Sequence, residues 1–212
     1  MRAIVAAFAI ALASCAGAPP APDWEVAAHS ALESFKSGYL AGRTRAAEQD
    51  FARARSALSA TGRADLVARA ELVRCAARTA SLELDDCPGY RALAADAAPA
   101  ERAYAAYLAG AAQATDLAWL PEHHRSATSA SLGAVTDPFA RLVAAGVLFR
   151  QARLAPEGFA LAVETASAQG WRRPLLAWLG VQEKRARDAG DREAADALGR
   201  RIRLVLDEDR AR

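Results

Sequence analysis

Residues 38–54 read GYLAGRTRAAEQDFARA, and this stretch predicts a helix, a tight turn and a second helix. Gly42 stands where the turn is expected, because glycine adopts left-handed backbone conformations without steric cost. After the turn, Ala47, Phe51 and Ala54 follow at intervals of four and three residues, which places them on one face of a helix. The stretch therefore predicts an antiparallel helical hairpin with an aromatic and two alanines at its interface.

The composition extends this helical character to the rest of the chain. Of the 212 residues, 53% are hydrophobic, and alanine supplies much of that fraction. Alanine has the highest helix propensity of any residue, and its small side chain lets helices approach closely. Segments of Val, Ile, Thr and aromatic residues that alternate at period two, as strands do, are absent. The sequence therefore predicts an all-α fold.

Apolar periodicity and capping residues divide the chain into further helical segments. Residues 24–207 are expected to form one helical domain, and 208–212 a frayed tail. The helix that follows Asp137 and Pro138 is apolar around most of its circumference, so we expect it to be central. We predict helices over 24–40, 44–59, 64–82, 90–96, 99–109, from 138 past 149, 156–170, 174–190 and 191–207.

The packing of these helices has two possible forms. Short turns between neighbours favour antiparallel hairpins, which either stack as a short α-solenoid or pack as an irregular helical bundle. On the helix over 64–82, Arg69, Arg74 and Arg78 are expected to form a solvated edge.

The charge pattern gives no indication of a nucleic-acid partner. The chain has 27 basic and 25 acidic residues, and Lys36 and Lys184 are its only lysines. The arginines are interspersed with acids and form no basic stripe, so nucleic-acid binding is not expected.

The N-terminal residues MRAIVAAFAIALASC have the pattern of a secretory signal peptide. The apolar run from Ala3 to Ala13 is too short to span a bilayer, which needs about 20 residues. Its end, from Leu12 to Cys15, resembles the lipobox of bacterial lipoproteins. The resemblance implies that residues 1–14 are removed and that Cys15 carries the lipid. An ordinary signal peptide cut near Ala16 or Ala18, with Cys15 discarded, is the alternative.

Residues 15–23 are small and proline-rich, as expected of a flexible tether. In Gram-negative lipoproteins an Asp after the lipidated cysteine commonly marks inner-membrane retention, and Ala16 stands there instead. The resemblance therefore implies a periplasmic domain that is lipid-anchored to the outer membrane.

The remaining cysteines, Cys75 and Cys87, form an even pair for an oxidising compartment. A disulfide between them would close a short loop and contribute about 3 kcal/mol. Two unpaired thiols are the alternative. No metal site is expected from these two residues alone.

The tetrapeptide from Tyr39 to Gly42 returns from Tyr107 to Gly110, an offset of twice 34 residues. Tetratricopeptide repeats have a 34-residue period. The chain resembles a divergent member of that family over residues 28–120 and 171–207, with Gly42, Ala47, Phe51 and Ala54 at repeat positions. The resemblance implies that Gly110, Ala114 and Trp119 correspond to Gly42, Ala46 and Phe51. An irregular bundle with coincidental spacing is the alternative.

Few residues suggest catalysis, metal binding or cofactor binding. His123 and His124 follow Glu122, but neighbouring residues on a helix point in different directions and seldom share one metal ion. Asp85 and Asp86 are expected to be a solvated acidic turn. No nucleophile, phosphate-binding or dinucleotide motif is present. We therefore expect no enzymatic activity, no metal and no cofactor.

The expected function is that of a scaffold or adaptor for another envelope protein or peptide. Residues 114–137 form the least regular segment and are the candidate partner-contacting loop. The large side chains Trp119, Trp171 and Trp178 either line a ligand groove or fill the core. An accessory to a cell-wall enzyme that uses 114–137, and a helical protein that binds a small molecule or lipid, remain alternatives.

Overall fold

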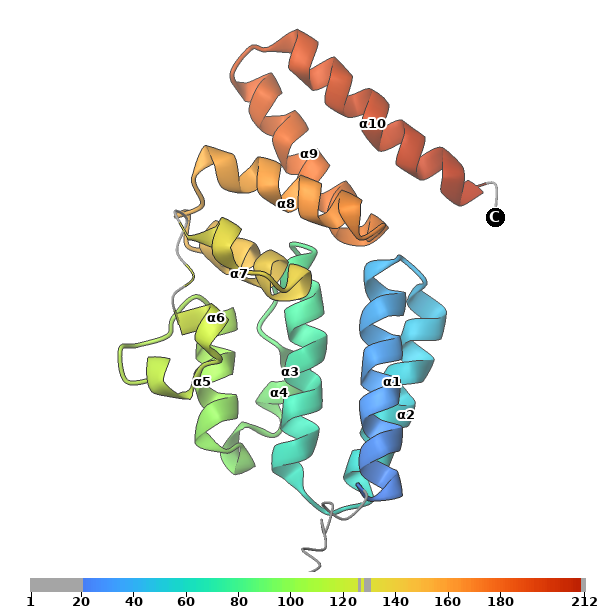
Figure 1. Ribbon diagram of the computed structural model, residues 1–212, viewed down its shortest axis with the longest axis vertical. Coiled ribbons are helices and arrows are strands. Elements are labelled where there is room, and N and C mark those ends of the chain that lie inside the picture. Colours follow the sequence, from blue (N-terminus) through green and yellow to red (C-terminus); the bar gives the residue numbers. More distant parts are fainter. Residues whose placement is uncertain (1–20, 126, 128–130, 211–212) are drawn as a thin grey trace, which may run out of the picture.

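The computed structural model describes residues 21–125, 127 and 131–210, and Cys15 with the predicted signal peptide lies outside them. Over the described residues the chain is all-α, without strands, as predicted (Figure 1). In chain order the elements are α1 (Asp23–Leu40), α2 (Thr44–Ser59), α3 (Ala64–Ala80), α4 (Pro88–Arg91), η1 (Ala94–Asp96), α5 (Pro99–Leu108), η2 (Leu117–Trp119), α6 (Glu122–Arg125), η3 (Leu132–Ala134), α7 (Pro138–Arg150), α8 (Pro156–Ala168), α9 (Arg172–Asp188) and α10 (Arg192–Arg210).

The predicted hairpin is formed by α1 and α2, which lie side by side at one edge of the molecule (Figure 1). Ala47, Phe51 and Ala54 are buried on the inner face of α2. A Cβ built on Gly38 would lie 3.4 Å from the Cβ of Ala47, so the two backbones approach closely at this point. The rings of Phe35 and Phe51 lie 5.2 Å apart between their centroids and fill the space beyond it.

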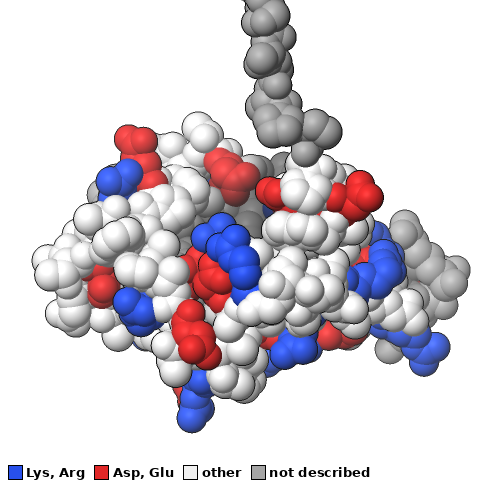
Figure 2. Space-filling view, turned by 90° about the horizontal axis from the view of Figure 1, so that it is seen from below, with Lys and Arg blue, Asp and Glu red and all other residues white. Residues whose placement is uncertain are grey.

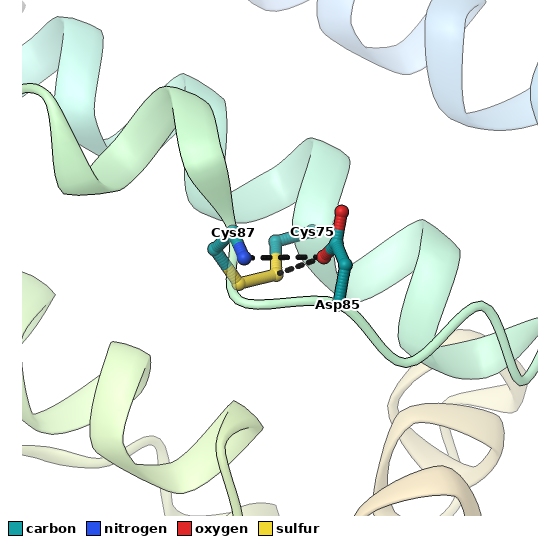
Figure 3. A group of neighbouring side chains, drawn as sticks. All are labelled: Cys75, Asp85 and Cys87. Carbon is teal, nitrogen blue, oxygen red and sulfur yellow. Dashed lines mark hydrogen bonds between the residues drawn. A yellow bond between two sulfur atoms is a disulfide. The ribbon is translucent and has the colours of Figure 1, made fainter.

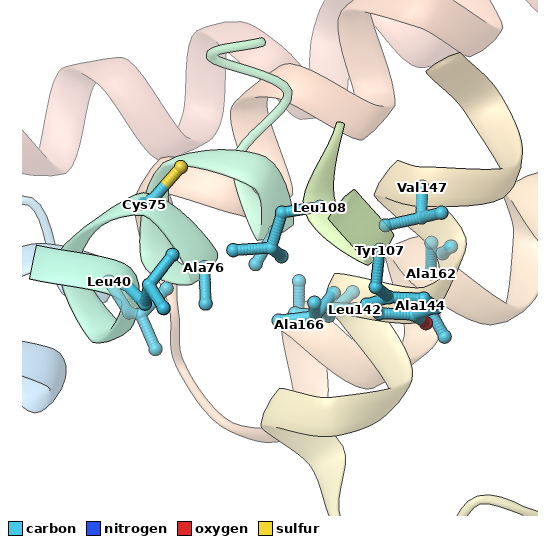
Figure 4. Close-up of a cluster of buried hydrophobic side chains, with 14 of the residues drawn as sticks. Leu40, Cys75, Ala76, Tyr107, Leu108, Leu142, Ala144, Val147, Ala162 and Ala166 are labelled. Carbon is cyan, nitrogen blue, oxygen red and sulfur yellow. The ribbon is translucent and has the colours of Figure 1, made fainter. Parts of the chain in front are cut away.

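Helix α3 occupies the centre and packs against α1, α2, α5 and α7. A Cβ on Gly146 of α7 would lie 2.3 Å from the carbonyl oxygen of Thr79, so only glycine allows α7 to cross α3 at this distance. Small and branched side chains from α3, α5, α7 and α8 converge beside this crossing (Figure 4). Eight residues of α7 are buried, which confirms that this helix is central.

The C-terminal helices continue the packing in chain order, since α7 contacts α8, α8 contacts α9 and α9 contacts α10. Trp178 of α9 is fully buried, and its indole Nε1 donates a hydrogen bond to the carbonyl of Ala80 at the end of α3. Arg173 ties α9 to the first hairpin, because its Nε donates to the carbonyl of Tyr39 and its guanidinium lies 4.2 Å from the Tyr39 ring.

Both copies of the tetrapeptide end a helix, and they do so with the same backbone geometry. Gly42 and Gly110 both have positive φ, +85° and +72°, and each stands directly after the last turn of its helix. The next backbone N–H then reaches back to the last turn: Arg43 donates to Gly38, and Ala111 to Ala106. These are the bonds of a Schellman helix terminus, in which glycine is favoured.

The segment after Gly110 differs from the prediction. Phe51 is buried after the first copy of the tetrapeptide, but Trp119, its predicted equivalent, lies in the short turn η2 with 55% of its surface exposed. No long helix is present between Gly110 and the start of α7 at Pro138 among the described residues. The predicted correspondence of Ala114 to Ala46 and of Trp119 to Phe51 is therefore wrong, whereas Gly110 ends its helix as Gly42 does.

Several predicted helix boundaries also differ from the structure. Helix α3 ends at Ala80 and not at 82, and the helix predicted over 90–96 is divided between α4 and η1. Helix α9 begins at Arg172, so Pro174 lies within its first turn. Helix α10 continues to Arg210, beyond the predicted end at 207, so the expected frayed tail over 208–212 is helical as far as Arg210.

The arginines of α3 do more than form a solvated edge. Arg69 pairs with Glu101 of α5. Arg74 pairs with Glu48 of α2, and Arg78 with Asp85 in the loop after α3. These ion pairs connect α3 to its neighbours.

Candidate functional site

The strongest candidate site is a hollow of about 200 Å³ between α3, α5 and the turn η2. We call it the Trp119 hollow. Trp119 forms one wall and is 55% exposed, although large aromatic side chains are usually covered in a folded domain. The lining is mainly apolar and aromatic, and it comprises Leu72, Val73, Ala100, Tyr104, Trp119 and Pro121.

Two charged side chains, Arg69 and Glu101, complete the Trp119 hollow. Glu101 is only 4% exposed, whereas the side chain of Arg69 is 63% exposed. The Nε of Arg69 donates a hydrogen bond to Oε1 of Glu101 at 2.8 Å, and its Nη2 forms an ion pair with the same oxygen at 2.7 Å. The second oxygen, Oε2, is buried and has no hydrogen-bond partner among the described residues.

Local sequence explains how these groups come to the hollow. Pro99 opens α5 and places Glu101 in the first turn, where the positive end of the helix dipole favours an acid. Trp119 is held by the preceding turn, since its backbone N–H donates to the carbonyl of Asp116. The carboxylate of Asp116 in turn accepts from the backbone N–H of Gln113 at 2.7 Å.

A second hollow of about 200 Å³ lies on the other side of Arg69, between α1, α2 and α3. Trp24, Leu32 and Leu66 contribute to its lining, and Arg69 borders both hollows. On the face seen from below, basic and acidic side chains are interspersed (Figure 2). The candidate site therefore combines apolar hollows with local charge pairs.

The two adjacent histidines lie in different environments. His124 is 5% exposed and packs against the rings of Tyr104 and Tyr107, at centroid distances of 5.5 and 4.7 Å. Burial, with a smaller contribution from the charge of His123, lowers the pKa of His124 to about 3. Burial also raises the pKa of Tyr104 and Tyr107. His124 is thus neutral near pH 7, while His123 is exposed and borders a different hollow with Glu122.

Cys75 and Cys87 lie at disulfide-bonding distance, as predicted, and the structure joins their sulfur atoms (Figure 3). Their Cα atoms are 5.5 Å apart, within the usual range for a disulfide. Asp85 Oδ1 accepts from the backbone N–H of Cys87 at 3.1 Å, and Asp85 Oδ2 pairs with Arg78 at 3.0 Å. Arg150 of α7 donates to the carbonyl of Asp85, so the loop is fixed to two helices.

Within the described part of the chain, Cys75, Asp85 and Cys87 are the residues that lie close enough together to be considered as metal ligands. One ligand atom each from Cys75, Asp85 and Cys87 lies within 4.8 Å of the others. The sulfurs of a disulfide are not thiolates, which are the form that binds metal ions. The adjoining hollow has a volume of only about 100 Å³. The bonded pair is therefore a covalent connection between α3 and α4.

The residues predicted as turn, repeat and acidic-loop positions serve the fold and form no site. Gly42 and Gly110 end helices, while Ala47, Phe51 and Ala54 are buried in the first hairpin. Asp86 is exposed and pairs with Arg91. Among the described helices, none combines the length and hydropathy that crossing a bilayer requires. The predicted lipidation position, Cys15, lies outside the described residues.

Comparisons with family models, curated proteins and solved structures give no match to the chain.

The sequence indicated one part of the Trp119 hollow and missed another. Trp119 lies within the irregular segment 114–137 that was expected to contact a partner. The ion pair of Arg69 and Glu101 was missed, because these residues are 32 positions apart and belong to different helices. The available signal was local: Glu101 is an acid in the first turn of a helix opened by proline.

Proposed function

We propose that this chain is a lipid-anchored protein of the cell envelope that binds a segment of another envelope protein at the Trp119 hollow. The observation that carries the proposal is the exposure of Trp119, at 55%, beside a largely apolar hollow. Exposed aromatics next to apolar pockets commonly anchor protein interfaces. The segment that presents Trp119 has only short helical turns between α5 and α7 in its described residues.

A non-enzymatic role fits the environment of the titratable groups near the hollow. His124 stacks on two tyrosines and stays neutral, which suits packing better than proton transfer near pH 7. Replacing Glu122, His123 and His124 together tests the enzymatic alternative. The variant should still fold and still bind its partner. If cells that carry it nevertheless behave like cells that lack the protein, an enzymatic role is favoured.

Anchoring at the outer membrane rests on the lipobox resemblance at Leu12–Cys15. The proposal predicts that the mature protein begins at Cys15 and carries fatty acyl groups. Mass spectrometry of the N-terminal peptide from membrane fractions measures both. Cys15→Ser should leave the protein unacylated and in the soluble fraction. An unprocessed N-terminus on cytosolic protein would contradict the proposal.

Partner binding can be tested by crosslinking in the native cells, followed by affinity capture of the full-length chain. Trp119→Ala should abolish recovery of the partner. Leu204→Ala is a matched control, because Leu204 is also an exposed large apolar residue, at 67%, but lies on α10. Equal recovery from wild type and both variants would show that the hollow is not the binding site. Recovery of glycan or lipid in place of protein would overturn the adaptor function.

A further inference from the structure

Helix α10 lies at an edge of the molecule and packs against α9 (Figure 1). Its packing face carries the buried Ala195 and the partly buried Leu198 and Ile202. The other side of α10 is exposed and carries four charged residues at intervals of three, four and three positions, which places them in one stripe along the helix. We call this the α10 stripe, and it comprises Glu193, Asp196, Arg200 and Arg203.

The charges of the α10 stripe form no ion pair with another described residue. On α9, by contrast, the acid and base of Lys184–Asp188 pair at 2.8 Å, one helical turn apart. Asp196 and Arg200 have the same separation along α10 but are not paired in the described structure. Beside the stripe, Leu204 is 67% exposed. The stripe therefore offers both charged groups and an apolar side chain to a second molecule.

The order of the charges along the α10 stripe is acid, acid, base, base, and this order complements itself when it is reversed. In an antiparallel pair of α10 helices with a two-fold axis at the level of Leu198, Glu193 meets Arg203 of the second copy and Asp196 meets its Arg200. Each pair occurs twice, because a two-fold interface repeats every contact.

Other arrangements of the two helices are disfavoured by the same charges. A parallel pair would place each charge opposite its own copy. A shift of the antiparallel pair by seven residues would place Glu193 opposite Asp196 in one direction and Arg200 opposite Arg203 in the other. Like charges in opposition select against these alternatives, so the pattern specifies one orientation and one register.

We propose that α10 binds α10 of a second copy of this chain along the α10 stripe, as an antiparallel two-fold dimer. Leu204 then lies against the first turn of the second copy's α10, which adds apolar contact. Exposed ion pairs are individually weak and are screened by salt, so the dimer should be reversible and sensitive to ionic strength. The α10 stripe is separate from the Trp119 hollow, so this inference does not depend on the proposed function.

Cysteine crosslinking of the full-length chain in permeabilised native cells tests the proposal. Ala197→Cys places a thiol at the edge of the stripe, next to the two-fold axis, so a mild oxidant should give a covalent homodimer on non-reducing electrophoresis. Ala52→Cys is the matched control, because Ala52 is exposed on α2, and it should stay monomeric. Salt at about 1 M should lower the yield from position 197. Equal dimer yields from the two positions, or a product of position 197 with a different protein, would overturn the proposal.

Reversing one charge and then its partner tests the register. In the Ala197→Cys chain, Asp196→Arg makes both central pairs repulsive and should lower the dimer yield roughly tenfold. Adding Arg200→Asp restores the attraction and should recover the yield. An unchanged yield with Asp196→Arg alone, or no recovery in the double exchange, would contradict the dimer. The same exchange at Glu193 and Arg203 repeats the test at the outer pairs, which keeps it decisive if circular dichroism shows that one variant does not fold.

Discussion

Trp178 and Trp119 show that residue type alone does not decide where a side chain lies. Trp178 is fully buried and packs against Phe149, at a centroid distance of 5.8 Å, with its indole nitrogen bonded to Ala80. Trp119 is 55% exposed. The difference comes from context, because Trp178 belongs to a long helix with an apolar face and Trp119 to a short turn. The functional hypothesis therefore depends on Trp119.

The lowered pKa of His124 predicts that the folded protein is less stable in acid. Its pKa is about 3 in the folded protein and about 6.5 in the unfolded chain, so the unfolded state binds the proton first. Above about pH 6.5 the titration of His124 does not reduce the free energy of unfolding. Below that pH the free energy of unfolding falls by about 1.4 kcal/mol for each pH unit. Denaturant unfolding of wild type and His124→Phe at pH 7.5 and 5.5 measures this. An equal loss in both proteins would contradict the prediction.

Gly146 and Gly180 form a matched pair for testing the crossing of α7 on α3. Gly146→Ala should destabilise the protein by about 1–3 kcal/mol, because its Cβ would meet the backbone of Thr79 at 2.3 Å. Gly180→Ala should be neutral or stabilise by up to about 1 kcal/mol, since nothing lies within 4 Å and alanine favours helix. Thermal unfolding compares the two, and similar effects would show that the crossing is not close.

At the scale of elements, helices and their ends were largely predictable from sequence. Asp137 accepts from the backbone N–H of Ala140, and Asp191 from that of Ala194, as expected of N-caps. Cap chemistry is local, so it can be read from adjacent residues. The tetrapeptide at Gly42 and Gly110 was informative for the same reason, as a signal for a helix end.

Contacts between distant elements were not predictable in this way. Nothing local indicates that Arg173 reaches the carbonyl of Tyr39, 134 residues earlier. The Trp119 hollow depends on the same kind of information, because α3 and α5 become its walls only after they pack. A single sequence therefore predicted the segment that carries Trp119 but not the ion pair of Arg69 and Glu101 beside it.

The Cys75–Cys87 disulfide predicts a redox-dependent stability. The bond closes a loop with a sequence separation of 12, so its loss should cost about 3 kcal/mol in the chain-entropy model. Unfolding midpoints with and without a dithiol reductant should differ for the wild type. The variant in which both cysteines are serine should resemble the reduced protein and ignore the reductant. A wild type that is equally insensitive would show that the bond does not form or does not stabilise.

At the scale of the whole molecule, the helices form a connected body in which the first hairpin also touches α9 (Figure 1). Arg173 makes that connection through the carbonyl of Tyr39, and it also pairs with Glu83 in the loop after α3. The tetratricopeptide geometry of the hairpins stays a prediction. The packed helices leave the Trp119 hollow at a surface, beside the turn η2.

The most direct test of the central claim, that the Trp119 hollow binds a partner protein, is photo-crosslinking in the native cells. A photoreactive phenylalanine replaces Ala100, which lines the hollow, or Ala52, which is exposed on α2. We predict one discrete protein crosslinked from position 100 and none from position 52, with the product lost when Trp119→Ala is added. No protein crosslink at position 100, or the same products from both positions, would contradict the claim.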